Sequence, residues 1–318
     1  MKRKIGLVAA ATAALIVLAG CSTPAPADDE GGKDITLWLM GGDTPDALRE
    51  FLKTEYADAT GGTLTIEEQD WTDALSKLTT SLPDAENTPD VTEIGNTWSP
   101  TFTTVGAFSD ISDMYEELGG DNLLPGFVEV GEVDGANYAL PYYFGSRYIF
   151  YRKDLWAAAG LSVPTTLAEF NEGVAKLKTD SQSGFYLGGQ DWRNGISWIF
   201  ANGGDLAKKD GDKWVSTLSD PKSIEGLTQF QDLFMNASTA PVTEADSTPW
   251  VNINNDKSGA PPTAATIIAP GWAHWSIGDF KEEKKNDDGT TTEVREWNDD
   301  TFGVFPLPGT TAGEPAPV

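Results

Sequence analysis

The sequence predicts an α/β protein built from mainly parallel sheets flanked by helices. Short apolar runs of strand length alternate along the chain with segments whose apolar residues recur at helical spacing. Capping residues and Gly or Pro breaks separate the two kinds of segment. Alternation of strands and helices favours crossover connections and parallel pairing. With 318 residues, of which 39% are hydrophobic, the chain is long enough for two domains with packed cores.

The N-terminal segment is expected to direct export rather than to join the fold. Residues 2–4 (KRK) are basic, and residues 5–17 form an apolar run too short to span a membrane, as in a secretory signal. Residues 18–21 (LAGC) resemble the lipobox of bacterial lipoproteins, which implies cleavage before Cys21, the single cysteine, and lipid attachment to it. The alternative is a buried or spare thiol beside an ordinary cleavage site. Residues 22–33 should form a flexible tether.

The first strand and helix are expected directly after the tether. Residues 34–40 (DITLWLM) are a short apolar run that suits a buried parallel strand. The next helix should take Thr44 as its N-cap and Pro45 in its first turn, and it should end at Gly61.

Two further pairs of strand and helix complete the first half. Residues 63–71 predict a strand, and residues 72–82 predict a helix capped by its own first residue, a threonine. Residues 89–95 predict a third strand. Ser99 and Pro100 should then act as cap and first turn of the next helix.

The second half repeats this pattern. Its predicted elements are, in order, a strand (146–152), a short helix (153–161), a helix capped by Thr165 or Thr166 (164–177), a long amphipathic helix that begins at Asp220 and Pro221, and two buried strands (265–272 and 301–309). Residues 281–300 are so polar that they predict an exposed hairpin or insertion.

Charge and missing motifs exclude several classes of protein. The 49 acidic and 22 basic residues give a formal net charge of −27, which would repel nucleic acid and an anionic membrane surface. The phosphate-binding motifs GxxxxGK[ST] and GxGxxG and the hydrolase motifs GxSxG and HExxH are absent. His274 is the sole histidine, so a His-rich metal site or a His-based triad has no support, and we expect it to pack locally. We therefore expect no cofactor, no metal ion and no nucleic-acid partner.

Aromatic residues give the strongest functional signal. Six of them lie at loop-like ends of predicted elements, several after strands and beside polar groups: Trp71, Trp98, Tyr142, Tyr143, Trp192 and Trp272. Ligands of open parallel sheets bind beyond the carboxyl ends of the strands. Flat aromatic faces suit the C–H faces of pyranose rings, while amide and carboxylate groups can bond the hydroxyls. The remaining tryptophans are assigned to core packing: Trp38, Trp156, Trp198, Trp214, Trp250, Trp275 and Trp297.

Six segments, taken together and in this order, are similar to a known family. They are ITLWLMGG (35–42), PDVTEIGNTWSPTFTTVGAFSDIS (89–112), YALPYYFGSRYIFYRKDLWAAAGL (138–161), PTTLAEF (164–170), APGW (269–272) and FGVFPLPG (302–309). The chain resembles the extracellular solute-binding proteins, family 1, of bacterial ABC importers, in the group that binds sugars. EIGNTW (93–98) with YRKDL (151–155) looks most like the actinobacterial lipoproteins that bind chito-oligosaccharides and related disaccharides, although maltose-type binders share much of the pattern.

The resemblance implies a two-lobed periplasmic-binding-protein-like fold of type II with a ligand cleft between the lobes. The expected domains are a signal peptide (1–20), the lipidated Cys21 and tether (21–33), lobe one (34–141) and lobe two (142–318). The ligand-binding residues that it implies are Asp43, Trp71, Asn96, Trp98, Tyr142, Tyr143, Arg147, Asp191, Trp192 and Trp272. For Arg147 the alternative is a surface ion pair.

The resemblance extends to the last residue, Val318, whereas the family continues through a second crossover strand and further helices. The C-terminal part is therefore expected to be missing, which would leave lobe one incomplete.

The expected function is binding without chemistry. The protein would be a monomer on the outer face of the cell membrane, anchored through lipid on Cys21, that captures a di- or oligosaccharide and delivers it to ABC permease subunits. Two other classes stay open. An exported glycoside hydrolase would share an aromatic cleft, although no carboxylate pair is singled out among so many acids. A sensory or adhesive lipoprotein would bind sugar without a permease.

Overall fold

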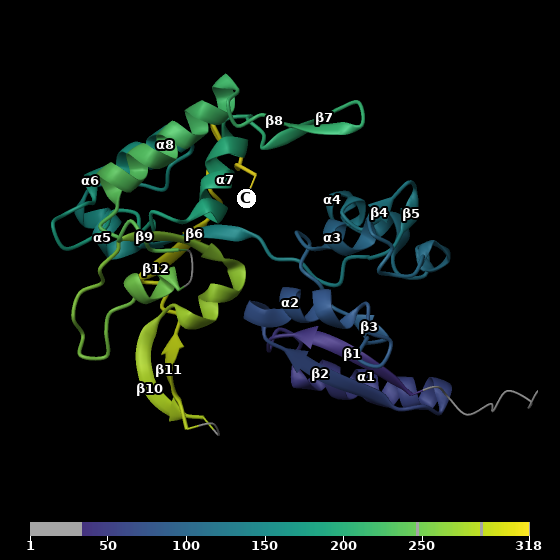
Figure 1. Ribbon diagram of the computed structural model, residues 1–318. Coiled ribbons are helices and arrows are strands. Elements are labelled where there is room, and N and C mark those ends of the chain that lie inside the picture. The colour runs from purple at the N-terminus through teal and green to yellow at the C-terminus, as the bar shows by residue number, and fades with distance from the viewer. Residues whose placement is uncertain (1–33, 246–247, 287–288, 318) are drawn as a thin grey trace, which may run out of the picture. The chain divides into compact units, whose positions relative to one another are not determined.

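The computed structural model describes residues 34–245, 248–286 and 289–317. The predicted signal peptide, Cys21 and the tether lie outside the described residues. The chain divides into two compact units, of which the first ends at Tyr142 and the second begins at Tyr143. Both mix helices and strands, as an α/β fold requires (Figure 1). The predicted cleft between lobes and the predicted lobe boundary stay predictions.

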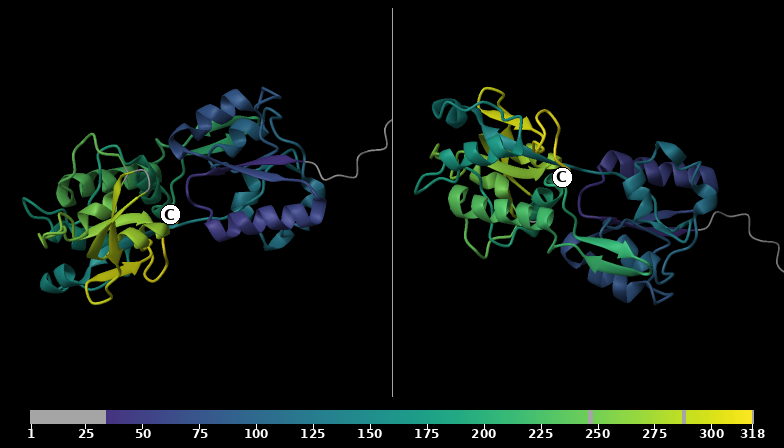
Figure 2. Two further views of the ribbon diagram at one scale, coloured as in Figure 1. Left: turned by 90° about the horizontal axis from the view of Figure 1, so that it is seen from below. Right: turned by 90° about the horizontal axis from the view of Figure 1, so that it is seen from above.

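The first unit is built on a three-stranded parallel sheet. Strand β1 (Ile35–Met40) lies between β2 (Leu64–Gln69) and the two-residue β3 (Val91–Thr92), and both pairings are parallel, as the sequence predicts. Helices α1 (Asp46–Thr60) and α2 (Trp71–Ser81) cover opposite faces of this sheet (Figures 1 and 2).

The core of the first unit lies between the sheet and α2. Trp38 and Met40 point to the same face because side chains alternate along a strand, and they pack against Ala74 and Leu78 of α2 and against Phe102. The remaining elements of this unit are α3 (Ser99–Thr103), α4 (Pro125–Glu129), the 3₁₀ turns Ser112–Met114 and Gly120–Asn122, and the hairpin of β4 (Glu132–Val133) and β5 (Ala136–Asn137).

The sheet of the second unit corrects the prediction of parallel pairing. Strand β6 (Arg147–Arg152) lies between β9 (Thr266–Pro270) and β12 (Phe302–Phe305) and runs antiparallel to both. Alternation predicts parallel neighbours only when one helix links adjacent strands. Here the described residues between β6 and β9 include four α-helices, a hairpin and the 3₁₀ helix η3 (Pro249–Asn252), so the chain can return in either direction.

Helices and hairpins surround this antiparallel sheet. The helices are α5 (Lys153–Ala158), α6 (Leu167–Lys176), α7 (Trp192–Ala201) and α8 (Pro221–Ala237). The hairpins are β7 (Ala207–Asp210) with β8 (Lys213–Ser216), and β10 (Asp279–Lys285) with β11 (Thr291–Glu296). The second hairpin begins two residues before the segment 281–300 predicted as an exposed hairpin and otherwise lies within it. Figure 1 shows the helices at one end of the unit and β10–β11 at the other. The core includes the fully buried Phe170, Phe185 and Trp198.

Three predicted helix caps in the first unit are wrong. Pro45 occupies the N-cap position of α1, and the Thr44 hydroxyl instead lies 3.2 Å from the hydroxyl of Tyr142. Helix α2 starts earlier than predicted because the Asp70 carboxylate accepts from the Thr72 amide at 2.7 Å. Ser99 is the first residue of α3, and its hydroxyl makes no cap bond.

The cap of α6 is correct and makes the stability of this helix depend on pH. Thr166 accepts from the Glu169 amide, while the Glu169 carboxylate accepts from the amides of Thr165 and Thr166. The backbone N–H of Thr165, followed by its hydroxyl, holds the pKa of Glu169 below its ordinary value. A lowered folded-state pKa stabilises the fold above the unfolded-state pKa, and this contribution is lost as pH falls through the folded-state pKa.

We expect Glu169→Gln to lower the melting temperature at pH 7 and to have a shrinking effect as the pH falls below about 4. Thermal melts between pH 7 and pH 3 would measure the difference. Glu172→Gln, on the same helix and paired with Lys176 at the surface, is the control and should change little. A deficit for Glu169→Gln that is equal at all pH values would contradict the role of the charged carboxylate.

Candidate functional site

The loop after β1 is held in shape by Arg49 of α1. Its Nε donates to the carbonyl of Thr44 at 2.8 Å and its Nη2 donates to the carbonyl of Gly41 at 3.0 Å. Its Nη1 lies 3.0 Å from a Glu68 carboxylate oxygen on β2. Two of these three contacts from one partly buried guanidinium hold the backbone on either side of Asp43.

Asp43 and Trp71 meet beside this loop. The indole Nε1 of Trp71 donates to the Asp43 carboxylate at 2.8 Å. Gly41 has a φ of +55°, and a Cβ there would lie 2.9 Å from Cδ1 of Trp71, so a larger residue would displace the indole. The turn thus requires glycine in order to keep Trp71 next to the carboxylate.

An aromatic pair extends this surface. The rings of Trp71 and Trp98 are tilted by 58° with centroids 5.5 Å apart. Trp71 is 37% exposed, Trp98 is half-buried, and Asn96 is exposed on the same loop as Trp98. Tyr142 reaches the loop after β1 through its bond to Thr44. The first unit therefore brings together the predicted Asp43, Trp71, Trp98 and Tyr142, with Asn96 beside them.

Arg147 and Trp272 lie at one end of the antiparallel sheet of the second unit. Arg147 begins β6 and pairs in register with Pro270, the last residue of β9. The Gly271 amide then donates to the Ser146 carbonyl at 2.9 Å, which ties the start of the 3₁₀ helix η4 (Gly271–Ser276) to this end of the sheet. Tyr143, half exposed, lies shortly before β6 in the chain.

A hydrogen-bonded group links Arg147 to the start of α7. Its Nη1 donates to Oδ1 of Asn194 at 3.0 Å, and Nδ2 of Asn194 donates to the Asp191 carboxylate at 2.5 Å. Asp191 also caps α7 by accepting from the Asn194 amide at 3.1 Å. Asp191 and Asn194 are 5% and 1% exposed, so these bonds lie in a region of low solvent access. The two interpretations of Arg147, as a ligand-binding residue and as a surface ion pair, stay predictions.

Two tryptophans remain open to solvent beside this group. Trp192, the first residue of α7, is 60% exposed and carries the guanidinium of Arg193 4.9 Å from its ring centroid. Trp272 is 57% exposed, and Trp250 packs against it edge to face with centroids 4.9 Å apart. The second unit therefore combines flat aromatic faces with an amide, a carboxylate and a guanidinium.

A model of the bacterial extracellular solute-binding proteins matches residues 52–306. The chain belongs to this family. The diacetylchitobiose binding protein DasA of Streptomyces coelicolor is 33% identical to this solute-binding protein, over 99% of this chain and 71% of that relative. A putative binding protein of Brucella abortus is 28% identical over 71% of this chain, which spans 56% of that relative's length.

Solved structures agree with the fold. The GacH receptor of Streptomyces glaucescens superposes with a TM-score of 0.67 at 21% identity, over 89% of this chain and 69% of that chain. The sugar-binding protein MalE of Xanthomonas citri gives 0.69 at 19% identity, over 89% and 68%. At these identities the likeness establishes the α/β fold of the family and not the ligand.

Sequence reasoning missed three residues that shape the candidate site of this solute-binding protein. Arg49 fixes the Asp43 loop, Asn194 joins Arg147 to Asp191, and Trp250 supports Trp272. The spacing of Asp191 and Asn194, which is that of an N-cap and its N3 residue, was a usable signal. The other contacts join segments far apart in the chain, which no local pattern reports.

Two tryptophans assigned to the core are in fact on the surface. Trp214 is 69% exposed on β8 and Trp275 is 78% exposed in η4, whereas Trp38, Trp156 and Trp198 are buried as predicted. His274 packs locally as predicted, between Trp275 and Trp297.

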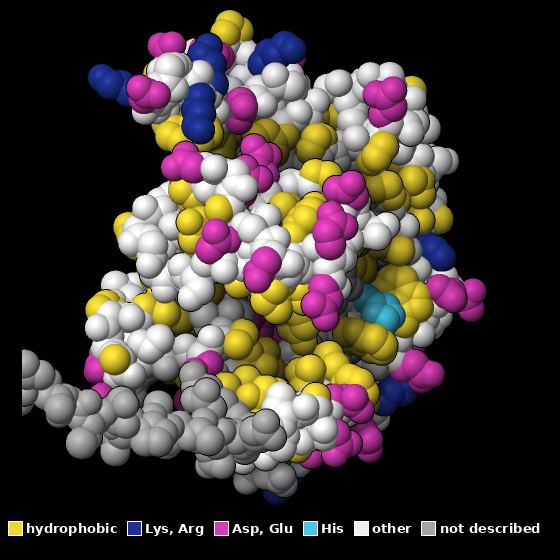
Figure 3. All heavy atoms as spheres, turned by 90° about the vertical axis from the view of Figure 1, so that its right-hand side faces the viewer, with side chains coloured by type: hydrophobic (Ala, Val, Ile, Leu, Met, Phe, Trp, Pro, Cys, Tyr) yellow, Lys and Arg dark blue, Asp and Glu magenta, His cyan; other side chains and the backbone are white. Residues whose placement is uncertain are grey.

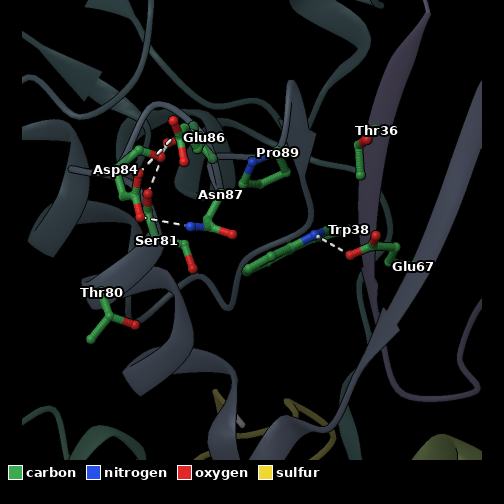
Figure 4. Close-up of a pocket in the computed structure, with 10 residues that line it drawn as sticks. Thr36, Trp38, Glu67, Thr80, Ser81, Asp84, Glu86, Asn87 and Pro89 are labelled. Carbon is green, nitrogen blue, oxygen red and sulfur yellow. Dashed lines mark hydrogen bonds between the residues drawn. The ribbon is translucent and has the colours of Figure 1, made fainter.

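A separate cavity lies in the first unit, away from the candidate site. It measures about 450 Å³ and is lined by residues of β1, β2, the end of α2 and the loop that follows: Thr36, Trp38, Glu67, Thr80, Ser81, Asp84, Glu86, Asn87, Thr88 and Pro89 (Figure 4). Thr36 and Thr80 lie at the ends of β1 and α2 opposite to those that bear Asp43 and Trp71. None of the predicted site residues lines it. Within the described ranges, no group of His, Cys, Asp and Glu is arranged to hold a metal ion, and no helix is long and apolar enough to cross a membrane.

Proposed function

We propose that this solute-binding protein captures a di- or oligosaccharide, leaves it unreacted and delivers it to the permease of an ABC importer. The observation that carries the proposal is that each unit exposes tryptophan faces beside groups that can bond hydroxyls. In the first unit these are Trp71 and Asp43, and in the second Trp272 and Arg147. The names of the relatives, a diacetylchitobiose binding protein and a sugar-binding protein MalE, support this class of ligand.

The chemistry of these groups suits a sugar. An indole face covers the C–H face of a pyranose ring, and carboxylate, amide and guanidinium groups bond hydroxyls in the plane of the ring. Micromolar affinity corresponds to about 8 kcal/mol, which a few stacked rings and hydroxyl bonds can supply after the cost of association. Nothing in this arrangement needs a nucleophile or a general acid.

We also propose that the protein is exported and lipid-anchored through Cys21. The basic residues 2–4, the apolar run 5–17 and the lipobox-like LAGC support this proposal. Several acyl chains would hold the protein on the outer face of the membrane, each CH₂ contributing about 0.8 kcal/mol. Mass spectrometry of the protein expressed in its membrane-attached form should find an acylated Cys21 as the first residue.

A tryptophan-fluorescence titration of the mature protein, from residue 22 onward, tests the function. We expect a saturable spectral shift with one of diacetylchitobiose, maltose, cellobiose and xylobiose, because Trp71 and Trp272 are exposed in the absence of ligand. The sugar should be recovered uncleaved. Cleavage would indicate a glycoside hydrolase, and no shift in folded protein would contradict a sugar ligand.

A further inference from the structure

The 3₁₀ helix η4 presents two exposed tryptophans in succession. Trp275 lies three positions after Trp272, and side chains at i and i+3 of a 3₁₀ helix eclipse each other. They therefore lie on the same side of η4. Their backbone positions are about 6 Å apart along the axis, at about 2.0 Å per residue, which is comparable to the advance of one pyranose unit in an oligosaccharide.

Trp275 is exposed although its surroundings are firmly anchored. His274 contacts its ring with centroids 4.6 Å apart, and the imidazole lies 5.7 Å from Trp297. Trp297 packs in turn against the buried Phe302 at 5.7 Å. Figure 3 shows the single histidine, in cyan, at the surface beside hydrophobic side chains. The Trp275 indole is 78% exposed, and its neighbours are packed against the core. A ligand that stacks on it would therefore pay little entropy to order this part of the site.

Trp272, the first tryptophan of η4, is already part of the candidate site. Trp250 braces Trp272 from one side at 4.9 Å, so Trp272 is free to stack through its exposed surface. Trp275 continues the same surface by one further step along η4. The aromatic surface of Trp272 and Trp275 thus continues the candidate site, where Arg147 supplies a polar group.

We infer that Trp275 forms an additional stacking position beyond Trp272 and that the ligand is an oligosaccharide longer than a disaccharide. This inference rests on the proposed function and narrows it. Trp272 would stack one ring and Trp275 the next along the chain of the sugar, while Arg147, which Asn194 and Asp191 hold in place, would bond hydroxyls near the first ring.

Calorimetric titration of the mature protein with the N-acetylated chito-oligosaccharides of two, three and four units tests it. We expect the wild-type protein to bind the longer oligomers more tightly, and Trp275→Ala to lower affinity for them by roughly 3- to 10-fold while changing affinity for the dimer less than twofold. Trp275→Phe should restore most of the preference for length. Trp214→Ala removes another highly exposed tryptophan, 69% against 78% for Trp275, from a different element and should leave all three affinities unchanged.

The possible outcomes distinguish failure of this inference from failure of the proposed function. Equal affinities of wild type and Trp275→Ala for every oligomer, with sugar still bound, would overturn the inference and leave the proposed function intact. An equal loss for the dimer and the longer oligomers would also overturn it, because Trp275 would then act at the first position. No binding of any of these oligomers by folded wild-type protein, together with no response to maltose, cellobiose or xylobiose, would overturn both.

Discussion

Replacing Asn194 by alanine is expected to lower the free energy of unfolding by about 3 kcal/mol and to weaken sugar binding. The Asn194 amide donates to the Asp191 carboxylate and its carbonyl oxygen accepts from Arg147, and the side chain is almost fully buried. Alanine removes both bonds at once and takes a donor from a carboxylate that is 5% exposed. Urea unfolding would measure the stability and calorimetry would measure the binding.

The control is Asn202→Ala at the other end of the same helix. Asn202 bonds the Gln229 side chain and the Trp198 carbonyl from a partly exposed position, so its loss should cost about 1 kcal/mol and leave binding intact. Asn194→Ala with wild-type stability and affinity would show that the bonds among Asp191, Asn194 and Arg147 do not hold in solution.

Sequence alone predicts the first unit well, for a physical reason. Strands β1 and β2 are parallel neighbours, so their carboxyl ends meet at one edge of the sheet. Asp43 follows β1 and Trp71 follows β2, and they meet through a hydrogen bond. Residues just past such strands can therefore be paired from the pattern of apolar runs.

The second unit resists the same reasoning because its contacts join segments that are distant in sequence. The pairing of β6 with β9 and β12 depends on how the intervening chain folds back, and local periodicity does not encode the direction of that return. The approach of Arg147 to Asn194, 47 residues later, depends on it too. The family resemblance predicts Arg147 and Asp191 as site residues, but it does not predict Asn194, which bonds both of them.

Composition also fails to separate core from surface among the tryptophans. Trp198 and Trp275 both lie in short helical segments rich in aromatic residues, yet the first is 0% and the second 78% exposed. Helix α8 covers Trp198 through Phe230, whose ring centroid lies 5.4 Å away. Which side of a short helix is covered depends on the element packed against it, and that element can be far away in the chain.

Replacing Trp272 by alanine is expected to weaken sugar binding by about 1–3 kcal/mol with little change in melting temperature. The side chain is 57% exposed and contacts Trp250 only through an edge-to-face pair, so the fold gains little from it. The same exposed face would be covered by the sugar. Titration with the sugar that binds best, and thermal melting of the free protein, would measure the two effects separately.

Trp192→Ala should also weaken sugar binding and change the melting temperature little, because Trp192 is 60% exposed at the start of α7, one residue after Asp191. Trp156→Phe gives the opposite pattern and serves as the control: Trp156 is 2% exposed and its Nε1 donates to the Thr266 hydroxyl at 2.9 Å, so its replacement should lower stability and spare binding. If Trp272→Ala instead lowers the melting temperature and binds sugar normally, Trp272 is a packing residue. Arg147 and Trp272 lie at the same end of the sheet, so this result would count against that end as the sugar site. The ligand would then have to contact another part of the second unit.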